Sequence, residues 1–381
     1  MAVNSLLELF LKLTNSRVKV SSIPDDSRQV AFGPVIPCQA IDELSTIYST
    51  IFFCIFAAYS LKVHKNAFIP KNHKTINLNK QHITSDAKTK YTLLGLLVIL
   101  IWATSASIVK QMVIFSNNNY LTDIVVYNAL AFLVLLPIVL KRGEFKVLKD
   151  KKVLKALIPA VLCNGFYDLF ITSAEGMADR IQYAQIGNYL WPMLIVLLLG
   201  ITKRNPSKAG IFSTLVGFLA VLVLFVPEVM GGGTMNSKDV WALLLGVVAA
   251  FLWASYSVIL GTHEELKSSV YLIPTLGQGV SSWVMLIFAT SFGKFNLVYI
   301  ANVPAMTCIV IYATIGMSLS YVLWAFVMTK HPALENFSVL SYLTPVLALL
   351  TTTLYFRGTF NIQILIAGIL IVIAIYISKM R

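Results

Sequence analysis

The residues best suited to chemistry in this sequence are polar groups that interrupt long apolar segments. Asp168 lies well inside one such segment, at the end of the run Cys-Asn-Gly-Phe-Tyr-Asp. A charge at the centre of a membrane helix costs roughly 2.5–3.5 kcal/mol on insertion scales, so its presence needs a reason. Asp168 therefore predicts a site for a substrate ammonium group or a proton-coupling carboxylate. The structural alternative is a partner on a neighbouring helix, such as Lys110.

A second set of polar groups follows at helical spacing. Gln182, Gln185, Tyr189 and Pro192 are three or four residues apart, so one face of a helix carries them all. Amide and phenol groups on one face predict a cavity wall, although hydrogen bonds between helices would use the same pattern. Trp191 lies beside this face, and the proline can open the backbone hydrogen-bond ladder nearby.

Aromatic residues are placed deep in the apolar segments, notably Trp102, Tyr167, Trp191 and Trp253. Indole and phenol rings could stack on a flat or apolar substrate, or attract a cation. Ordinary packing between helices is the alternative.

Several chemistries are missing from the sequence. It has no phosphate-binding G-x-x-x-x-G-K-[ST] loop and no G-x-S-x-G serine motif. All five histidines fall in expected connections or in the leading segment, and no apolar segment carries a His/Asp/Glu cluster at metal-ligand spacing. The four cysteines are far apart and are expected to be free thiols. The sequence thus predicts neither an enzyme nor a metal or cofactor. Glu175, Asp179 and Arg180 are expected in a connection, where they need no functional explanation.

The composition defines the elements that must position these groups. Of 381 residues, 57% are hydrophobic and only 12% are charged, whereas soluble proteins carry about 25% charged residues. The apolar residues form blocks long enough to span a bilayer. This excludes a soluble enzyme or a disordered chain and predicts an all-α membrane protein with ten transmembrane helices. They are expected near 92–114, 121–140, 153–175, 179–201, 209–227, 239–262, 269–291, 304–328, 333–355 and 362–379.

The distribution of positive charge predicts the orientation of these helices. Alternate connections and the C-terminus hold fourteen Lys and Arg residues, and the other side holds four. Cytoplasmic connections collect Lys and Arg, so both ends of the ten-helix unit are expected in the cytoplasm. Topology also accounts for the net charge of +13 without a nucleic-acid partner. The fourteen are Lys141, Arg142, Lys146, Lys149, Lys151, Lys152, Lys155, Lys203, Arg204, Lys208, Lys267, Lys330, Lys379 and Arg381; the four are Arg180, Lys238, Lys294 and Arg357.

Residues 1–87 form an N-terminal extension. Its apolar block at 45–61 is short for a span and is either an eleventh membrane or interfacial helix or part of a poorly ordered extension. The polar, basic stretch 64–90 is expected to be a cytoplasmic linker.

The two halves of the ten-helix unit resemble each other at an offset of 150 to 154 residues. Trp-Ala-Thr-Ser at 102–105 matches Trp-Ala-Ser-Tyr at 253–256, and Asn-Tyr-Leu-Trp-Pro at 188–192 matches Ser-Tyr-Leu-Thr-Pro at 341–345. Tyr167 and Tyr321 also correspond. These matches predict two five-helix repeats, 88–228 and 229–381, of opposite orientation because five is odd. Inverted repeats are a recurrent plan of transporters that work by alternating access.

The sequence also resembles a known family. Ten helices as 5+5, the Trp-Ala-x-Ser of the first helix and the prolines of the fourth and ninth resemble the EamA-type transporters of the drug/metabolite transporter superfamily. The motif at 188–192 is similar to that of bacterial aromatic amino acid exporters. The resemblance implies a monomer with a central substrate cavity, lined by Tyr167, Asp168, Tyr189, Trp191 and Trp253.

The function expected from sequence is therefore export of a small molecule through the lipid bilayer of a bacterial inner membrane, with aromatic amino acids as the leading substrates. The residue pattern and the resemblance together give these expected substrate-binding residues: Trp102, Tyr167, Asp168, Gln182, Gln185, Tyr189, Trp191 and Trp253. A purine, a nucleotide sugar or an organic cation is the alternative cargo, and an integral membrane enzyme acting on lipid is the alternative class.

Overall fold

The computed structural model describes residues 76–202, 208–231, 235–298, 302–331, 334–356 and 362–379, so the apolar block at 45–61 lies outside the described residues. All secondary structure in these ranges is helical. Ten of its helical segments are long and apolar enough to cross a membrane. The predicted all-helical fold with ten spans is thus confirmed.

The first span belongs to a longer helix than the sequence predicted. Helix α3 covers Ile76–Phe115, although only Lys88–Phe115 is apolar enough to span. The stretch from Ile76 to Lys90, expected to be a cytoplasmic linker, is helical, and its role as a linker stays a prediction. A helix extends more easily than it begins, because each added residue forms a hydrogen bond without a new nucleus. The next two spans are α4 (Tyr120–Arg142) and α5 (Lys151–Met177), with the short helix η1 (Glu144–Lys149) between them.

Three of the remaining spans consist of more than one helical segment. The fourth is α6 (Ile181–Asn188) followed by α7 (Trp191–Thr202), and the ninth is α13 (Leu334–Leu340) followed by α14 (Leu343–Tyr355). The eighth runs through α11 (Val303–Ile311), the π-helical η4 (Tyr312–Leu319) and α12 (Ser320–Lys330). The others are α8 (Lys208–Gly231), α9 (Ser237–Thr262), α10 (Leu272–Ser291) and α15 (Ile362–Lys379), and the short helix η2 (Glu264–Ser268) precedes α10.

Prolines explain why the fourth and ninth spans are broken. A proline has no N–H and its ring clashes with the carbonyl four residues earlier, so a helix is interrupted there. Pro192 has no N–H to donate to the carbonyl of Asn188, the last residue of α6. Pro345 likewise has no N–H for the carbonyl of Ser341, which directly follows α13. Both breaks fall within the two motifs that match between the halves of the sequence. At the second break, the carbonyl of Ser341 accepts from the backbone N–H of Thr344 at 3.0 Å instead of from residue 345.

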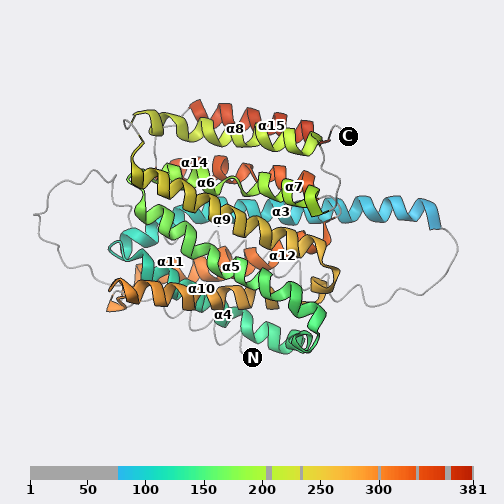
Figure 1. Cartoon of the computed structure of the whole chain (residues 1–381), viewed down its shortest axis with the longest axis horizontal. Coiled ribbons are helices and arrows are strands. Elements are labelled where there is room, and N and C mark those ends of the chain that lie inside the picture. Colours follow the sequence, from blue (N-terminus) through green and yellow to red (C-terminus); the bar gives the residue numbers. More distant parts are fainter. Residues whose placement is uncertain are drawn as a thin grey trace, which may run out of the picture. The chain divides into compact units, whose positions relative to one another are not determined.

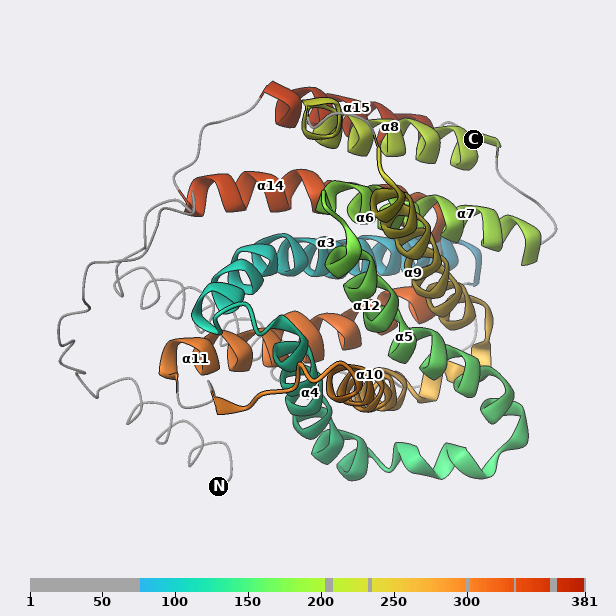
Figure 2. The same cartoon turned by 60° about the vertical axis from the view of Figure 1, so that its left-hand side comes forward.

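The helices pack in pairs that are distant in sequence. Helices α8 and α15 lie side by side (Figures 1 and 2), around a core that includes Val221, Leu224 and Ile371. Helix α5 packs against both α9 and α10. Helices α6 and α9 approach closely, because a Cβ on Gly246 would lie 2.4 Å from the carbonyl oxygen of Ala184.

Consecutive spans are joined by short connections, so their ends alternate between two sides of the bundle. The helix ends at residues 142, 151, 202, 208, 262, 272, 330 and 334 lie on one side, which we call the basic side because most of the Lys and Arg residues are near these ends in the sequence. The helix ends at residues 115, 120, 177, 181, 231, 237, 291, 303, 355 and 362 lie on the opposite side.

Candidate functional site

A cavity of about 830 Å³ lies among the spans. Its lining residues belong mainly to the halves of the helices that lead to the opposite side: 102–113 in α3, 167–176 in α5 and 181–189 around α6. The cavity therefore extends from the middle of the bundle toward the opposite side. Its size is within the range of pockets that hold small molecules.

Four aromatic residues close the deep end of the cavity, and we call them the aromatic floor: Trp102, Trp191, Trp253 and Tyr321. Their ring centroids lie 5.2–6.5 Å apart in mostly edge-to-face arrangements, which aromatic rings favour. They come from α3, α7, α9 and α12, so the floor joins helices from both halves of the chain.

A second layer fixes the orientation of the floor. The indole N–H of Trp102 donates to the Ser320 hydroxyl at 2.9 Å. Trp324 is completely buried behind the floor, 5.1 Å from Trp102 between ring centroids, and donates its own N–H to Ser257 at 3.1 Å. Because Ser320 satisfies its N–H, Trp102 needs no polar partner from the cavity.

Tyrosines and an amide continue the wall above the floor. Tyr167 lies 5.2 Å from Trp253 between ring centroids and is hydrogen-bonded through its hydroxyl to the Asn188 side chain. Tyr189 lines the cavity at the break between α6 and α7 and stacks on Phe225 of α8 at 6.3 Å. Tyr312 lines it from the π-helical segment, and π-helical turns are frequent at functional sites.

Asp168 lies in the wall and is largely buried. One of its carboxylate oxygens, Oδ2, accepts hydrogen bonds from Asn128 Nδ2 at 2.8 Å and from Ser281 Oγ at 2.6 Å. These donors come from α4 and α10, so the carboxylate bridges three helices. The partner considered from sequence, Lys110, instead lies over the ring of Phe356 at 4.2 Å.

Glu175 is a cavity residue that the sequence reasoning missed. It was expected in a connection without a role, but α5 continues to Met177 and carries Glu175 into the lining. Its carboxylate accepts a hydrogen bond of 2.5 Å from Gln185 Nε2 on α6. The signal was in the sequence, because Asp168, Thr172 and Glu175 have the spacing of a single helix face.

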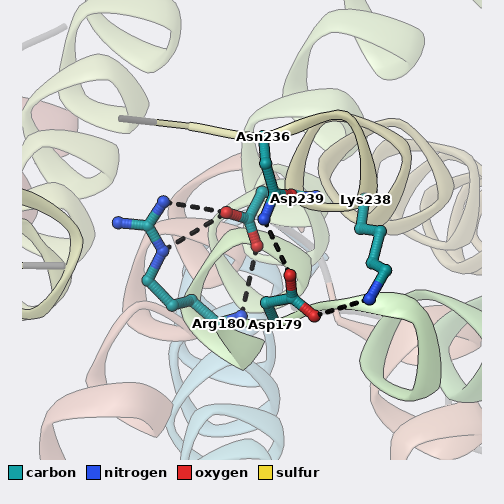
Figure 3. A network of polar contacts seen from close by, with 5 residues as sticks. All are labelled: Asp179, Arg180, Asn236, Lys238 and Asp239. Carbon is teal, nitrogen blue, oxygen red and sulfur yellow. Dashed lines mark hydrogen bonds and ion pairs between the residues drawn. The ribbon is translucent and has the colours of Figure 1, made fainter. Parts of the chain in front are cut away.

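A polar network holds the turn between α5 and α6, just beyond Glu175 (Figure 3). Arg180 donates to the buried Asp239 carboxylate at 2.8 Å from its guanidinium and at 3.1 Å from its backbone N–H. Asp179 accepts from Lys238 at 3.1 Å and from Asn236 at 2.7 Å. The network thus ties the turn to the start of α9.

Electrostatics reinforce this network. Hydrogen bonds from Lys238 and Asn236 hold the pKa of Asp179 below its usual range, so the carboxylate stays charged. The hydrogen bond from Arg180 to Asp239 raises the pKa of the guanidinium above its usual value. Because the turn is fixed on both sides, Glu175 and Gln185 are held across it within hydrogen-bond distance.

Seven of the eight residues predicted to bind substrate line this one cavity: Trp102, Tyr167, Asp168, Gln185, Tyr189, Trp191 and Trp253. Gln182 does not line it. The lining face of α6 passes through Ile181, Gln185 and Asn188, and Gln182 lies beside this face. Binding of a substrate by the seven residues stays a prediction.

Comparison with known proteins finds a family match in the second half of the chain. A sequence profile of the EamA-like transporter family matches residues 240–380. The match is a likeness of this part of the chain to that family. The family consists of membrane transporters of small metabolites or drugs, which are typically not enzymes. Residues 240–380 lie within the predicted second repeat.

The chain is also similar in three dimensions to a solved structure. A solved structure described as "Crystal structure of protein" is similar to this chain with a TM-score of 0.62 and 21% identity, and the match covers 76% of this chain and 97% of the other. This likeness concerns the fold alone. No curated protein matches the chain in sequence.

Proposed function

We propose that the chain is an alternating-access exporter of small aromatic metabolites, with aromatic amino acids as the leading substrates. The observation that carries the proposal is the aromatic floor at the deep end of a cavity of about 830 Å³. Three tryptophans and a tyrosine at one level favour a flat, apolar ligand, which can pack on ring faces and edges. Trp102, Tyr167, Trp191, Trp253 and Tyr189 would hold the ring of the substrate.

The polar end of the substrate would lie farther from the floor. Asp168, Gln185 and Asn188 offer carboxylate and amide groups along the walls between the floor and the opposite side. A buried site whose polar groups need a partner discriminates strongly against ligands that lack one. This combination of aromatic and polar walls supports a small amphipathic metabolite over a purely apolar compound.

The mode of transport in this proposal follows from the repeat. Two halves of opposite orientation, 88–228 and 229–381, would exchange conformations and open the cavity to each side in turn. The matching positions of the two helix breaks, after Asn188 and after Leu340, support this arrangement. With the basic side in the cytoplasm of a bacterial cell, the structure would be the state that faces outward. We propose that one chain is sufficient for transport, since the cavity is lined from within a single chain.

The experiment that tests the proposed substrate is export of labelled phenylalanine from bacterial cells preloaded with a phenylalanine dipeptide, with and without the protein. Faster export is expected, and it should fall in Trp191→Ala and in Asp168→Asn. Trp241→Ala is the matched control, because Trp241 is 57% exposed and does not line the cavity. If export is unchanged while the protein is present in the membrane, aromatic amino acids are not the substrate.

A second candidate substrate is an organic cation. Asp168 and Glu175 place two carboxylates on the cavity wall, and aromatic rings attract cations through their faces. Efflux of tetraphenylphosphonium from the same cells, without an effect on phenylalanine, would favour this candidate.

A further inference from the structure

A strongly basic surface surrounds the connection between α4 and α5. Seven of the fifteen residues from 141 to 155 are Lys or Arg, all seven are exposed, and only two of the fifteen are acidic. We call these exposed Lys and Arg residues the basic patch. The connection 262–272, whose ends lie on the same side of the bundle, has a single lysine against two glutamates. The tendency of cytoplasmic connections to collect Lys and Arg therefore does not by itself explain seven of them in one connection.

The two acidic residues of this connection have other partners. Glu144 is largely buried, pairs with Arg142 at 3.0 Å, and accepts from two backbone N–H groups at the start of α10 at 2.9 and 3.1 Å. Asp150 accepts from the backbone N–H of Lys152 at 2.8 Å. In the described part of the chain, no lysine of the basic patch takes part in an ion pair. The charges of these lysines are thus available to a partner from outside the chain.

The basic patch belongs to an ordered element. The apolar residues Phe145, Val147 and Leu148 of η1 pack against the hydrophobic core, whereas Lys146 and Lys149 of the same short helix are exposed. The hydrogen bonds of Glu144 to α10 hold this arrangement in place. A preordered surface loses less conformational entropy on binding than a flexible segment does.

Helix stability does not account for the lysines at the start of α5. Lys151, Lys152 and Lys155 lie near the N-terminus of this helix, which has no acidic residue in its first turn. The N-terminus of a helix carries a partial positive charge, so lysines are unfavourable there and an anion is favourable. The basic patch therefore provides an environment for a negatively charged partner.

The place of the basic patch in the bundle favours a lipid as that partner. One span ends at Arg142 and the next begins at Lys151, so the patch lies where a membrane has its headgroups. Leu140 and Ile158, which flank the patch in α4 and α5, are exposed apolar side chains suited to contact with acyl chains. Clusters of Lys and Arg directly beside a membrane helix attract anionic lipids.

We propose that the basic patch binds the phosphate groups of anionic phospholipids in the leaflet on the basic side. Phosphate oxygens accept strong charge-assisted hydrogen bonds from lysine ammonium groups. The acyl chains of the same lipids lie along the exposed apolar faces of α4 and α5. This binding goes beyond the proposed function and does not rest on it, because neither the cavity nor its substrate takes part.

The test measures thermal unfolding of the purified full chain in a nonionic detergent, titrated with dioctanoyl phosphatidylglycerol or dioctanoyl phosphatidylcholine. A ligand that binds the folded protein raises its unfolding midpoint. Phosphatidylglycerol should raise the midpoint more than phosphatidylcholine, and high salt should remove the difference, because salt screens exposed charges. The triple variant Lys146→Gln, Lys149→Gln and Lys152→Gln should weaken the apparent affinity for phosphatidylglycerol at least about tenfold.

A matched triple variant separates the basic patch from net charge. Lys88→Gln, Lys208→Gln and Lys294→Gln together remove three exposed lysines outside the patch and should retain the response. Arginine at the three patch positions keeps the charge and should retain it too. Equal responses of the patch variant and the matched variant would overturn the proposal. If inorganic phosphate raises the midpoint as much as phosphatidylglycerol does, the patch binds free anions and the lipid proposal is wrong.

Discussion

Trp102 and Trp253, which occupy matching positions in the first and sixth spans, meet edge to face at the floor of the cavity with ring centroids 5.6 Å apart. Residues separated by 151 positions in sequence thus form one surface. Trp102 is the more exposed of the two and faces the space that a ligand would fill. Trp253 lies under it, only 4% exposed.

This relationship predicts different effects for substitutions at Trp102. Trp102→Ala should weaken phenylalanine binding about tenfold, since it removes an aromatic contact of about 0.5–1.5 kcal/mol together with apolar area. Trp102→Phe keeps a ring and loses the hydrogen bond to Ser320 and part of the indole area, so it should retain most of the binding. Fluorescence titration measures both. Trp283→Ala, at a 68% exposed position, is the control and should have no effect. Equal loss in the Ala and Phe variants would contradict a stacking role.

The spans were predictable from sequence because a membrane imposes a simple rule of length and polarity. The predicted 121–140 and 239–262 correspond to α4 at Tyr120–Arg142 and α9 at Ser237–Thr262. The break in the fourth span was also indicated, because Pro192 cannot continue a helix from Asn188. Polar helix outside the membrane leaves no such signal, which is why the start of α3 at Ile76 was missed.

The site was predictable only in part. Residues such as Trp191 and Tyr189 are identified by type and depth, because large polar-aromatic side chains are unusual in a span. Glu175 was missed because it ends the predicted span 153–175 and was assigned to the connection, whereas α5 continues to Met177. The partners of Asp168 come from α4 and α10, and a single sequence gives no measure of which helices meet.

The close contact of α6 and α9 predicts that Gly246 cannot be replaced. A Cβ at this position would lie 2.4 Å from the carbonyl oxygen of Ala184, and backbone cannot move aside as a flexible side chain can. Gly246→Ala should therefore destabilise the protein by about 1–3 kcal/mol, the usual cost of overpacking. Gly368→Ala is a matched control, because nothing lies within 4 Å of the added methyl group. Thermal unfolding in detergent compares the two; equal midpoints would contradict the predicted packing.

The bridge made by Asp168 predicts coupling between α5 and α10. Asp168→Ala should destabilise the protein by about 1–3 kcal/mol, since Asn128 and Ser281 would lose a shared acceptor in a buried position. Ser281→Ala alone should cost less, because it removes one donor and leaves the bond from Asn128. The double variant should be less destabilised than the sum of the two, as expected for residues in contact. Strictly additive free energies of unfolding would show that the hydrogen bond contributes nothing.

The two ion pairs at the turn between α5 and α6 predict unequal effects on stability. Asp239 has a fully buried side chain and Arg180 is 16% exposed at its side chain, whereas Lys238 and Asp179 are 63% and 49% exposed. Removing one partner of a pair with a buried side chain leaves an uncompensated charge, which is costly. An exposed pair contributes little to stability, because water and salt screen it. Arg180→Met should therefore lower the stability far more than Lys238→Met.

Thermal unfolding in detergent also distinguishes the loss of a charge pair from the loss of a side chain. In Arg180→Met with Asp239→Asn, the buried charge is absent, so much of the stability lost in Arg180→Met should return. High salt should reduce the small effect of Lys238→Met and leave that of Arg180→Met nearly unchanged, because screening acts mainly on exposed charges. If Arg180→Met and Lys238→Met cost the same at all salt concentrations, the Arg180–Asp239 pair does not hold the turn that places Glu175 opposite Gln185.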